Sequence, residues 1–144
     1  MKTWVVVASA ARARVFDVQS RREPMHELLD LVNPQERLQR QELKSDKPGR
    51  AFDSLGGHRH ALQTPVDPKE QVAQRFSKDV VDKLEAGLYQ KQFDTLCVVA
   101  PPHFLGLLRE HMSNALARTV KGDLAKDLTR EDADSVRAHV EPLL

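Results

Sequence analysis

The side chains in this sequence best suited to chemistry are gathered in one glycine-rich segment, residues 46–65, which carries few apolar residues to bury. Its glycines allow backbone angles that are closed to other residues and let a partner approach the main chain closely. Basic side chains alternate with them, and arginine guanidinium groups match the geometry of phosphate oxygens. We therefore predict a nucleic-acid or anion-binding site here, formed by Lys47, Arg50, Gly56, Gly57, His58, Arg59 and His60.

Three further residues favour an ordered site over the alternative, which is a solvated charged loop. Phe52 offers an apolar anchor inside the segment, and Asp46 and Asp53 are placed to pair with its arginines. Binding to a phosphate backbone through such a site is independent of base sequence and weakens as salt rises.

A metal site is a second hypothesis for the same segment. His58 and His60 form an H-x-H pair, and Asp53 precedes them closely. Zinc also needs a third protein ligand and a shaped cavity, and His103 or His111 supplies one only if the fold brings it across. The alternative is a pair of loop histidines in contact with solvent, phosphate or backbone. We expect no cofactor, and a metal-dependent hydrolase that uses Asp53, His58 and His60 is kept as the alternative.

The placement of acidic residues disfavours nuclease chemistry. Two-metal nucleases need clustered carboxylates, and in ribonuclease H-like nucleases the first of these lies in the middle of the first strand. The first predicted strand here, W-V-V-V-A, contains no acid, and nothing in the sequence brings Asp17, Asp53 and Asp94 together. We therefore expect a binding protein rather than an enzyme.

Composition indicates an ordinary globular chain. Its 144 residues suit a single domain over 1–144. The net charge of +1 means that any polyanion binding must come from local clustering. One cysteine, Cys97, excludes an internal disulfide and fits a reducing compartment. No apolar stretch is long enough to cross a bilayer, and the N-terminal apolar stretch is short for a secretory signal. We expect a cytoplasmic location without membrane contact.

Five strands are predicted from apolar patterning. Residues 4–8 form a β-branched run that is typical of a central strand buried on both faces. Residues 12–18 alternate, which predicts a second strand with one partly exposed face. A third strand is predicted at residues 25–32, and connections this short require antiparallel pairing. Later strands are predicted at residues 94–100 and 120–126.

Helices are predicted after the third strand. One begins at Asp67, whose side chain can cap it, with Glu70 completing a capping box, and it ends near residues 87–90. Another is predicted over residues 104–117 from its apolar periodicity.

A capping box formed by Thr129 and Asp132 predicts a C-terminal helix. Residues 35–43 are compatible with a short surface helix inside a long basic loop at about residues 33–66. The resulting order, β-β-β-α-β-α-β-α, predicts an α/β, single-domain, ribonuclease H-like mixed sheet with right-handed crossovers.

Five blocks of this sequence resemble the bacterial host-attachment protein family, and together they run over nearly the whole chain. They lie at residues 6–16, 48–61, 67–76, 93–109 and 126–129. Because several separate blocks match, the resemblance is specific. It implies a role in attaching bacteria to host cells, which describes a biological effect and names no chemistry.

That family is similar in fold to the middle domain of archaeal and eukaryotic peptide-chain release factors. In release factors a Gly-Gly-Gln tip in the corresponding loop promotes peptidyl-tRNA hydrolysis, and the ribosome-rescue relatives lack it. Here the interval holds Gly56, Gly57 and His58 without the glutamine, so hydrolytic release is not expected.

The residues and the resemblance together predict a non-enzymatic host-attachment family protein. We expect it to bind RNA, the ribosome or another phosphate-bearing partner through the basic loop. The alternative is an adhesion-related protein that acts through a protein or glycan partner. The sequence leaves the oligomeric state open.

Overall fold

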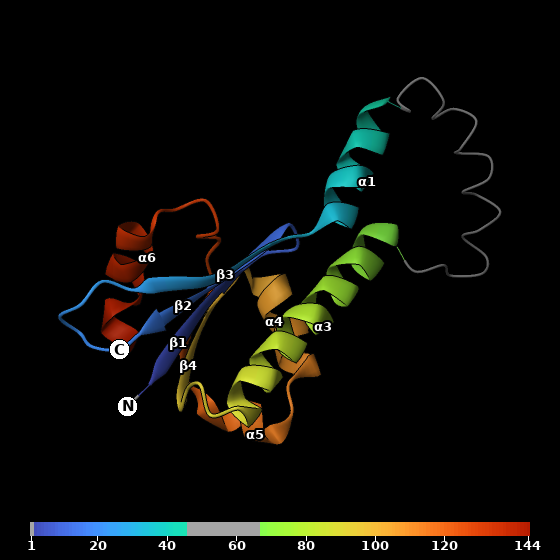
Figure 1. Cartoon of the computed structure of the whole chain (residues 1–144). Helices are drawn as coiled ribbons and strands as arrows, with labels where there is room; N and C mark the ends of the chain where they lie inside the picture. Colours follow the sequence, from blue (N-terminus) through green and yellow to red (C-terminus); the bar gives the residue numbers. More distant parts are fainter. Residues whose placement is uncertain (1, 46–66) are drawn as a thin grey trace.

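The computed structural model describes residues 2–45 and 67–144 of the chain. Within these ranges five strands form one sheet in the order β3-β2-β1-β4-β5 (Figure 1). The strands are β1 Thr3–Ala8, β2 Arg12–Val18, β3 His26–Val32, β4 Thr95–Val99 and β5 Val120–Leu124. β1 pairs antiparallel with β2 and parallel with β4, so it joins an antiparallel half of the sheet to a parallel half.

Helices cover both faces of this sheet. They are α1 Pro34–Ser45, α3 Pro68–Tyr89, α4 Pro102–His111, α5 Asn114–Thr119 and α6 Ala133–Val140, with a 3-10 turn at Glu141–Leu143. α3, α4 and α5 lie on one face and α6 on the other, while α1 and α3 lie side by side at one end of the molecule (Figure 1). No helix in the described ranges is long and apolar enough to cross a membrane.

The two central strands separate two apolar cores. Residues that alternate along β1 point to opposite faces, as the pleat of a strand requires. Trp4 and Val6 therefore pack toward α3 and α4, whereas Val5 and Val7 pack toward α6. This burial on both faces confirms the prediction made from the uninterrupted apolar run at the start of the chain.

The predicted mixed α/β sheet is confirmed, but the order of elements along the chain differs from the predicted one. α1, expected only as a short surface helix within the long loop, spans Pro34–Ser45 and adds a helix to the order. The narrower assignment to the ribonuclease H-like class stays a prediction.

The prediction of a single helix over residues 104–117 is wrong, because the helical conformation is interrupted between α4 and α5. Met112 adopts an extended conformation, and the Ser113 hydroxyl caps α5 by accepting from the Leu116 backbone N–H at 3.1 Å. The Glu85 carboxylate on α3 accepts from both the backbone N–H and the hydroxyl of Ser113 at 2.8 Å. These polar contacts end one helix and start the next, although the apolar periodicity continues through the break.

The predicted capping box at the C-terminal helix is also wrong. α6 is capped by Asp132, whose carboxylate accepts from the Ser135 backbone N–H at 2.8 Å. Thr129 instead lies three residues before this cap, where its hydroxyl donates to Asp127 at 2.6 Å. Hydrogen bonds within the segment between β5 and α6 and with the first turn of α6 thus hold it as an ordered loop. This loop forms part of the site described below.

Candidate functional site: an arginine-lined groove

The groove lies at the edge of the sheet where the parallel strands β1 and β4 end. In open α/β sheets this edge is the usual place for a ligand. The turn after β1, the start of α1 and the loop after β5 meet here around a cavity of about 390 Å³. Its lining residues are Ala11, Arg12, Val32, Asn33, Glu36, Arg37, Arg40, Thr129 and Arg130. We call this cavity the arginine groove.

Positive charge dominates the arginine groove. Among the residues that the structure describes, four guanidinium groups line it and one carboxylate, that of Glu36, does so. Because the whole chain carries a net charge of only +1, this edge concentrates charge that the composition does not reveal. A clustered guanidinium set of this kind favours oxyanions, phosphate above all.

Asn33 fixes the junction that places α1 beside the sheet. Its side chain is buried, and its Nδ2 donates to the Ala10 carbonyl at 2.9 Å. Its backbone N–H donates to the Ala11 carbonyl at 2.8 Å, and its Oδ1 accepts from the Gln35 N–H at 3.2 Å. The same residue therefore caps α1 and ties it to the turn between β1 and β2. Arg37 and Arg40 lie on the helical turns of α1 that follow.

Arg12 opens β2 and forms one wall of the groove. Its Nε and Nη2 donate to the two carboxylate oxygens of Asp30 at 2.7 and 2.5 Å, and its Nη1 donates to the Thr129 carbonyl at 3.1 Å. These hydrogen bonds hold the pKa of Asp30 below its ordinary value and raise the pKa of Arg12. About a third of the Arg12 side chain is exposed, so solvent and a ligand can still reach it.

Arg14, two residues along the same face of β2, performs a different task. The sequence predicted a partly exposed face for this strand, but Arg14 is only 7% exposed. It makes a forked pair with Glu27 at 2.9 and 3.0 Å and donates to the carbonyls of Thr129 at 3.3 Å and Glu131 at 2.5 Å. Arg14 thus binds the backbone on both sides of Arg130 and holds that residue at the rim of the groove.

Two of the groove arginines have no ion-pair partner in the described part of the chain. Arg40 pairs with Glu36 at 2.6 Å across one turn of α1. Arg37 and Arg130 are exposed, and no carboxylate among residues 2–41 and 67–144 lies in ion-pair contact with either. Within the described residues, the guanidinium groups of these two arginines are therefore not neutralised by a carboxylate.

The site predicted from sequence lies elsewhere in the chain. Lys47, Arg50, Gly56, Gly57, His58, Arg59 and His60 lie outside the described residues, and so does Asp53. Both the anion-site prediction and the metal alternative therefore stay predictions. His103, a possible third ligand, is paired with Glu70 on α3 at 2.7 Å, and the Nε2 atom of His111 is buried without a partner in the described part of the chain.

Sequence reasoning missed every arginine of the groove. Their positions are scattered over the chain, and only two of them, Arg37 and Arg40, are close enough in sequence to suggest a common helix face. The sequence feature that could have indicated the groove was Arg12, a charged residue directly after the short turn that follows a buried strand.

Taken together, these elements define a single-sheet α/β protein with an arginine-lined groove at the carboxyl ends of its parallel strands. Comparison with known proteins gives the family. The profile of the family described as "Protein required for attachment to host cells" matches residues 4–140, and the chain belongs to this family. It is also similar to an uncharacterized protein of Rickettsia prowazekii (strain Madrid E), with 28% identity over 123 residues, covering 82% of this chain and 75% of the relative.

Proposed function

We propose that this host-attachment family protein is a non-catalytic binding protein that holds a phosphate-bearing partner, RNA in the first place, in the arginine groove. The observation that supports this most directly is the lining of the groove, four arginines against one glutamate. An affinity built on such a lining is electrostatic, independent of base sequence and sensitive to salt.

Each arginine has a distinct part in this binding. Arg37 and Arg130 supply unpaired charge and make the first contacts with a phosphate. Arg12 and Arg40 each keep a carboxylate partner. That partner orients the guanidinium group, and the N–H donors that the carboxylate does not use are left for the ligand. Arg14 lies outside the lining and acts as a positioning residue for Arg130.

The basic loop predicted from sequence extends the same proposal. It follows α1, which contributes two arginines to the groove, so loop and groove are consecutive in the chain. A cytoplasmic location, a fold kinship with the release-factor middle domain and an association with the ribosome belong to this proposal. The adhesion-related alternative requires a surface location, which cell fractionation distinguishes from a cytosolic pool.

The test is RNA binding by the double variant Arg37→Ala with Arg130→Ala. Fluorescence anisotropy with a labelled single-stranded RNA, repeated over a range of salt, measures affinity and salt dependence together. Losing two phosphate contacts should make the negative slope of log K against log salt shallower by about 1.4, since each single-strand contact contributes about −0.7. Affinity at low salt should fall about tenfold or more.

The matched control is Arg118→Ala, which removes an exposed arginine of α5, outside the groove. It should leave the slope unchanged. A second comparison, Arg50→Ala with Arg59→Ala, separates the groove from the loop. If only the loop variant weakens binding, the groove is not the site. If the intact protein binds neither RNA nor ribosomes in a pelleting assay at low salt, the whole proposal is wrong.

A further inference from the structure

β3 is the outer strand of the antiparallel half of the sheet, and its outer side pairs with no strand in the described residues. Four large apolar side chains are exposed in that part of the chain. Three of them, Leu28 at 47%, Val32 at 49% and Leu38 at 49%, lie on β3 or on the helix that follows it. An unpaired edge bordered by exposed apolar side chains is the usual setting for strand addition by another chain.

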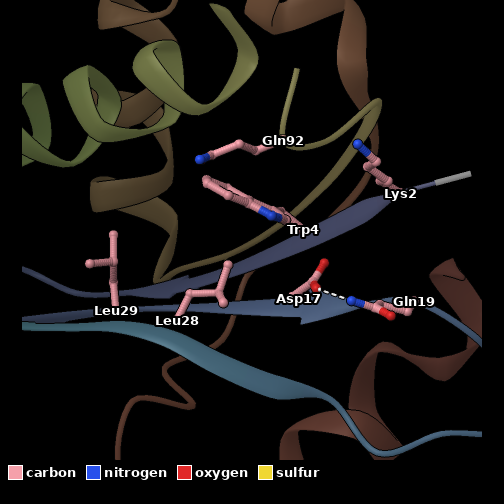
Figure 2. Close-up of a pocket in the computed structure, with 7 residues that line it drawn as sticks. All are labelled: Lys2, Trp4, Asp17, Gln19, Leu28, Leu29 and Gln92. Atoms are coloured by element: carbon pink, nitrogen blue, oxygen red, sulfur yellow. Dashed lines mark hydrogen bonds between the residues drawn. The ribbon is translucent and has the colours of Figure 1, made fainter. Parts of the chain in front are cut away.

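A first hollow lies beside the N-terminal half of β3. Figure 2 shows Trp4, Leu28 and Leu29 on the same side of the sheet, with polar side chains around them. A β-bulge causes this arrangement, because Val15 pairs with Leu29 and Phe16 pairs with Glu27, which leaves Leu28 without a partner on β2. The hollow has a volume of about 780 Å³, and Trp4, Leu28 and Leu29 are the apolar residues that line it.

A second hollow lies farther along the same strand. Leu31, Val32 and Phe76 supply its apolar wall, and its volume is about 540 Å³. Asp79 and Asp82, which lie on α3 as Phe76 does, also line it. Both carboxylates are exposed, and neither takes part in an ion pair within the described ranges, so this hollow carries unpaired negative charge beside a single lining cation, Lys83.

We propose that β3 binds an extended segment of a partner protein by strand addition, with a large apolar side chain in the first hollow and a lysine or arginine in the second. Main-chain hydrogen bonds to β3 would supply affinity, and the two hollows would select the side chains. Side chains on one face of a strand recur every second residue. The apolar and the basic residue of the partner are therefore two or four positions apart.

Charge argues against a second copy of this chain as the occupant. In a β3–β3 pairing the added strand would be His26–Val32, H-E-L-L-D-L-V, which contains neither lysine nor arginine. Its two carboxylates, Glu27 and Asp30, are already paired with Arg14 and Arg12, so this strand brings no free cation to Asp79 and Asp82. The bulge further disturbs a regular ladder between two copies. A basic side chain of a partner would pair with the carboxylates of the second hollow, whereas β3 of a second copy has no basic side chain that could do so.

The probe is a synthetic acetylated peptide seven residues long, the length of β3. It carries threonine at most positions, leucine at the third and lysine at the fifth. Trp4, the single tryptophan of the chain, lines the first hollow and reports binding through its emission. Two further peptides serve as comparisons: one has glutamate in place of lysine, and the other is N-methylated at alternate residues so that it lacks ladder donors.

We expect saturable binding of the lysine peptide, at least tenfold weaker binding of the glutamate peptide and none of the N-methylated peptide. The double variant Asp79→Asn with Asp82→Asn should weaken binding of the lysine peptide about tenfold, since it removes two exposed charge contacts. Leu28→Glu should weaken it at least as much. Glu110→Gln, a matched change of an exposed carboxylate on α4, should have no effect.

Three results would each overturn the proposal. The first is equal binding of the N-methylated peptide, because strand addition needs the peptide N–H groups. The second is undiminished binding to the Asp79→Asn, Asp82→Asn variant. The third is a sedimentation experiment in which the chain alone dimerises and Leu28→Glu makes it monomeric, because the edge would then belong to a second copy. RNA binding by the arginine groove is measured separately and does not decide any of these outcomes.

Discussion

Replacement of Arg14 by methionine should destabilise the protein far more than the same change at Arg12. The two arginines lie two residues apart on one strand, and each makes a forked pair with a carboxylate of β3 and donates to the Thr129 carbonyl. They differ in burial, since the Arg14 side chain is 8% exposed and that of Arg12 is 34% exposed. The difference in burial should therefore determine how much stability each variant loses.

The magnitudes follow from what each change leaves behind. Removing one partner of a buried ion pair costs about 3–5 kcal/mol, and the lower end applies because a third of the Glu27 side chain stays exposed and can rehydrate. The Glu131 carbonyl also loses the donor that Arg14 supplies, and the Phe16 ring loses a guanidinium 4.9 Å from its centroid. We expect Arg14→Met to lower the free energy of unfolding by about 3 kcal/mol. Arg12→Met, at an exposed pair, should lower it by less than about 1 kcal/mol.

Urea unfolding followed by Trp4 emission and by circular dichroism measures both values. For a chain of this length, about 3 kcal/mol corresponds to a fall in Tm of about 10 °C. Similar losses in the two variants would show that burial does not govern these pairs. A loss below about 1 kcal/mol for Arg14→Met would show that the loop after β5 does not depend on it.

Three further predictions concern Gly87, Asp30 and Cys97. Gly87→Ala should lower the free energy of unfolding by about 2 kcal/mol despite the better helix propensity of alanine, because the new Cβ would meet the Trp4 ring at 2.6 Å; a more stable variant in urea unfolding would contradict this. Asp30→Asn should destabilise the protein at neutral pH but not in acid. Because the folded-state pKa of Asp30 is lowered by Arg12, the stabilisation by this carboxylate is complete above its ordinary value of 3.8 and disappears as pH falls through the lower folded value. Thermal unfolding of both proteins between pH 7 and pH 3 checks this, and a constant difference in Tm would refute it. The Cys97 thiol should react with a thiol reagent only on unfolding, because burial raises its pKa and leaves the side chain inaccessible; rapid reaction of the native protein would count against this burial.

The sequence was most informative where one local signal decided the structure. The runs of β1 and β4 predicted central strands, and both strands are buried on both faces. Asp67 caps α3 as predicted, accepting from the Lys69 N–H at 2.9 Å. The host-attachment family was also predicted, because its matching blocks are spread along the chain, and the family profile confirms it.

Local signals failed where distant residues decided the outcome. The break between α4 and α5 depends on Glu85, which contacts Ser113 across 28 residues of sequence. The burial of Arg14 depends on the loop that returns over it more than a hundred residues later. A pattern read along one strand cannot show which later segment will cover it. The prediction of a partly exposed face on β2 failed at Arg14 for this reason.

The groove escaped prediction for a related reason, and the same reason accounts for its form. Its arginines come from a hairpin turn, a helix start and a loop, and only the meeting of strand ends at one sheet edge gathers them. Because Arg14 and Arg12 both bind the carbonyl of Thr129, the loop that carries Arg130 is anchored to β2 before any ligand arrives. Guanidinium groups held in place in this way need less ordering when an anion binds. The ion pairs of β2 therefore both stabilise the sheet and position the loop of the groove. If the proposed function is right, Arg14→Met should weaken RNA binding in the anisotropy assay, although Arg14 does not line the groove.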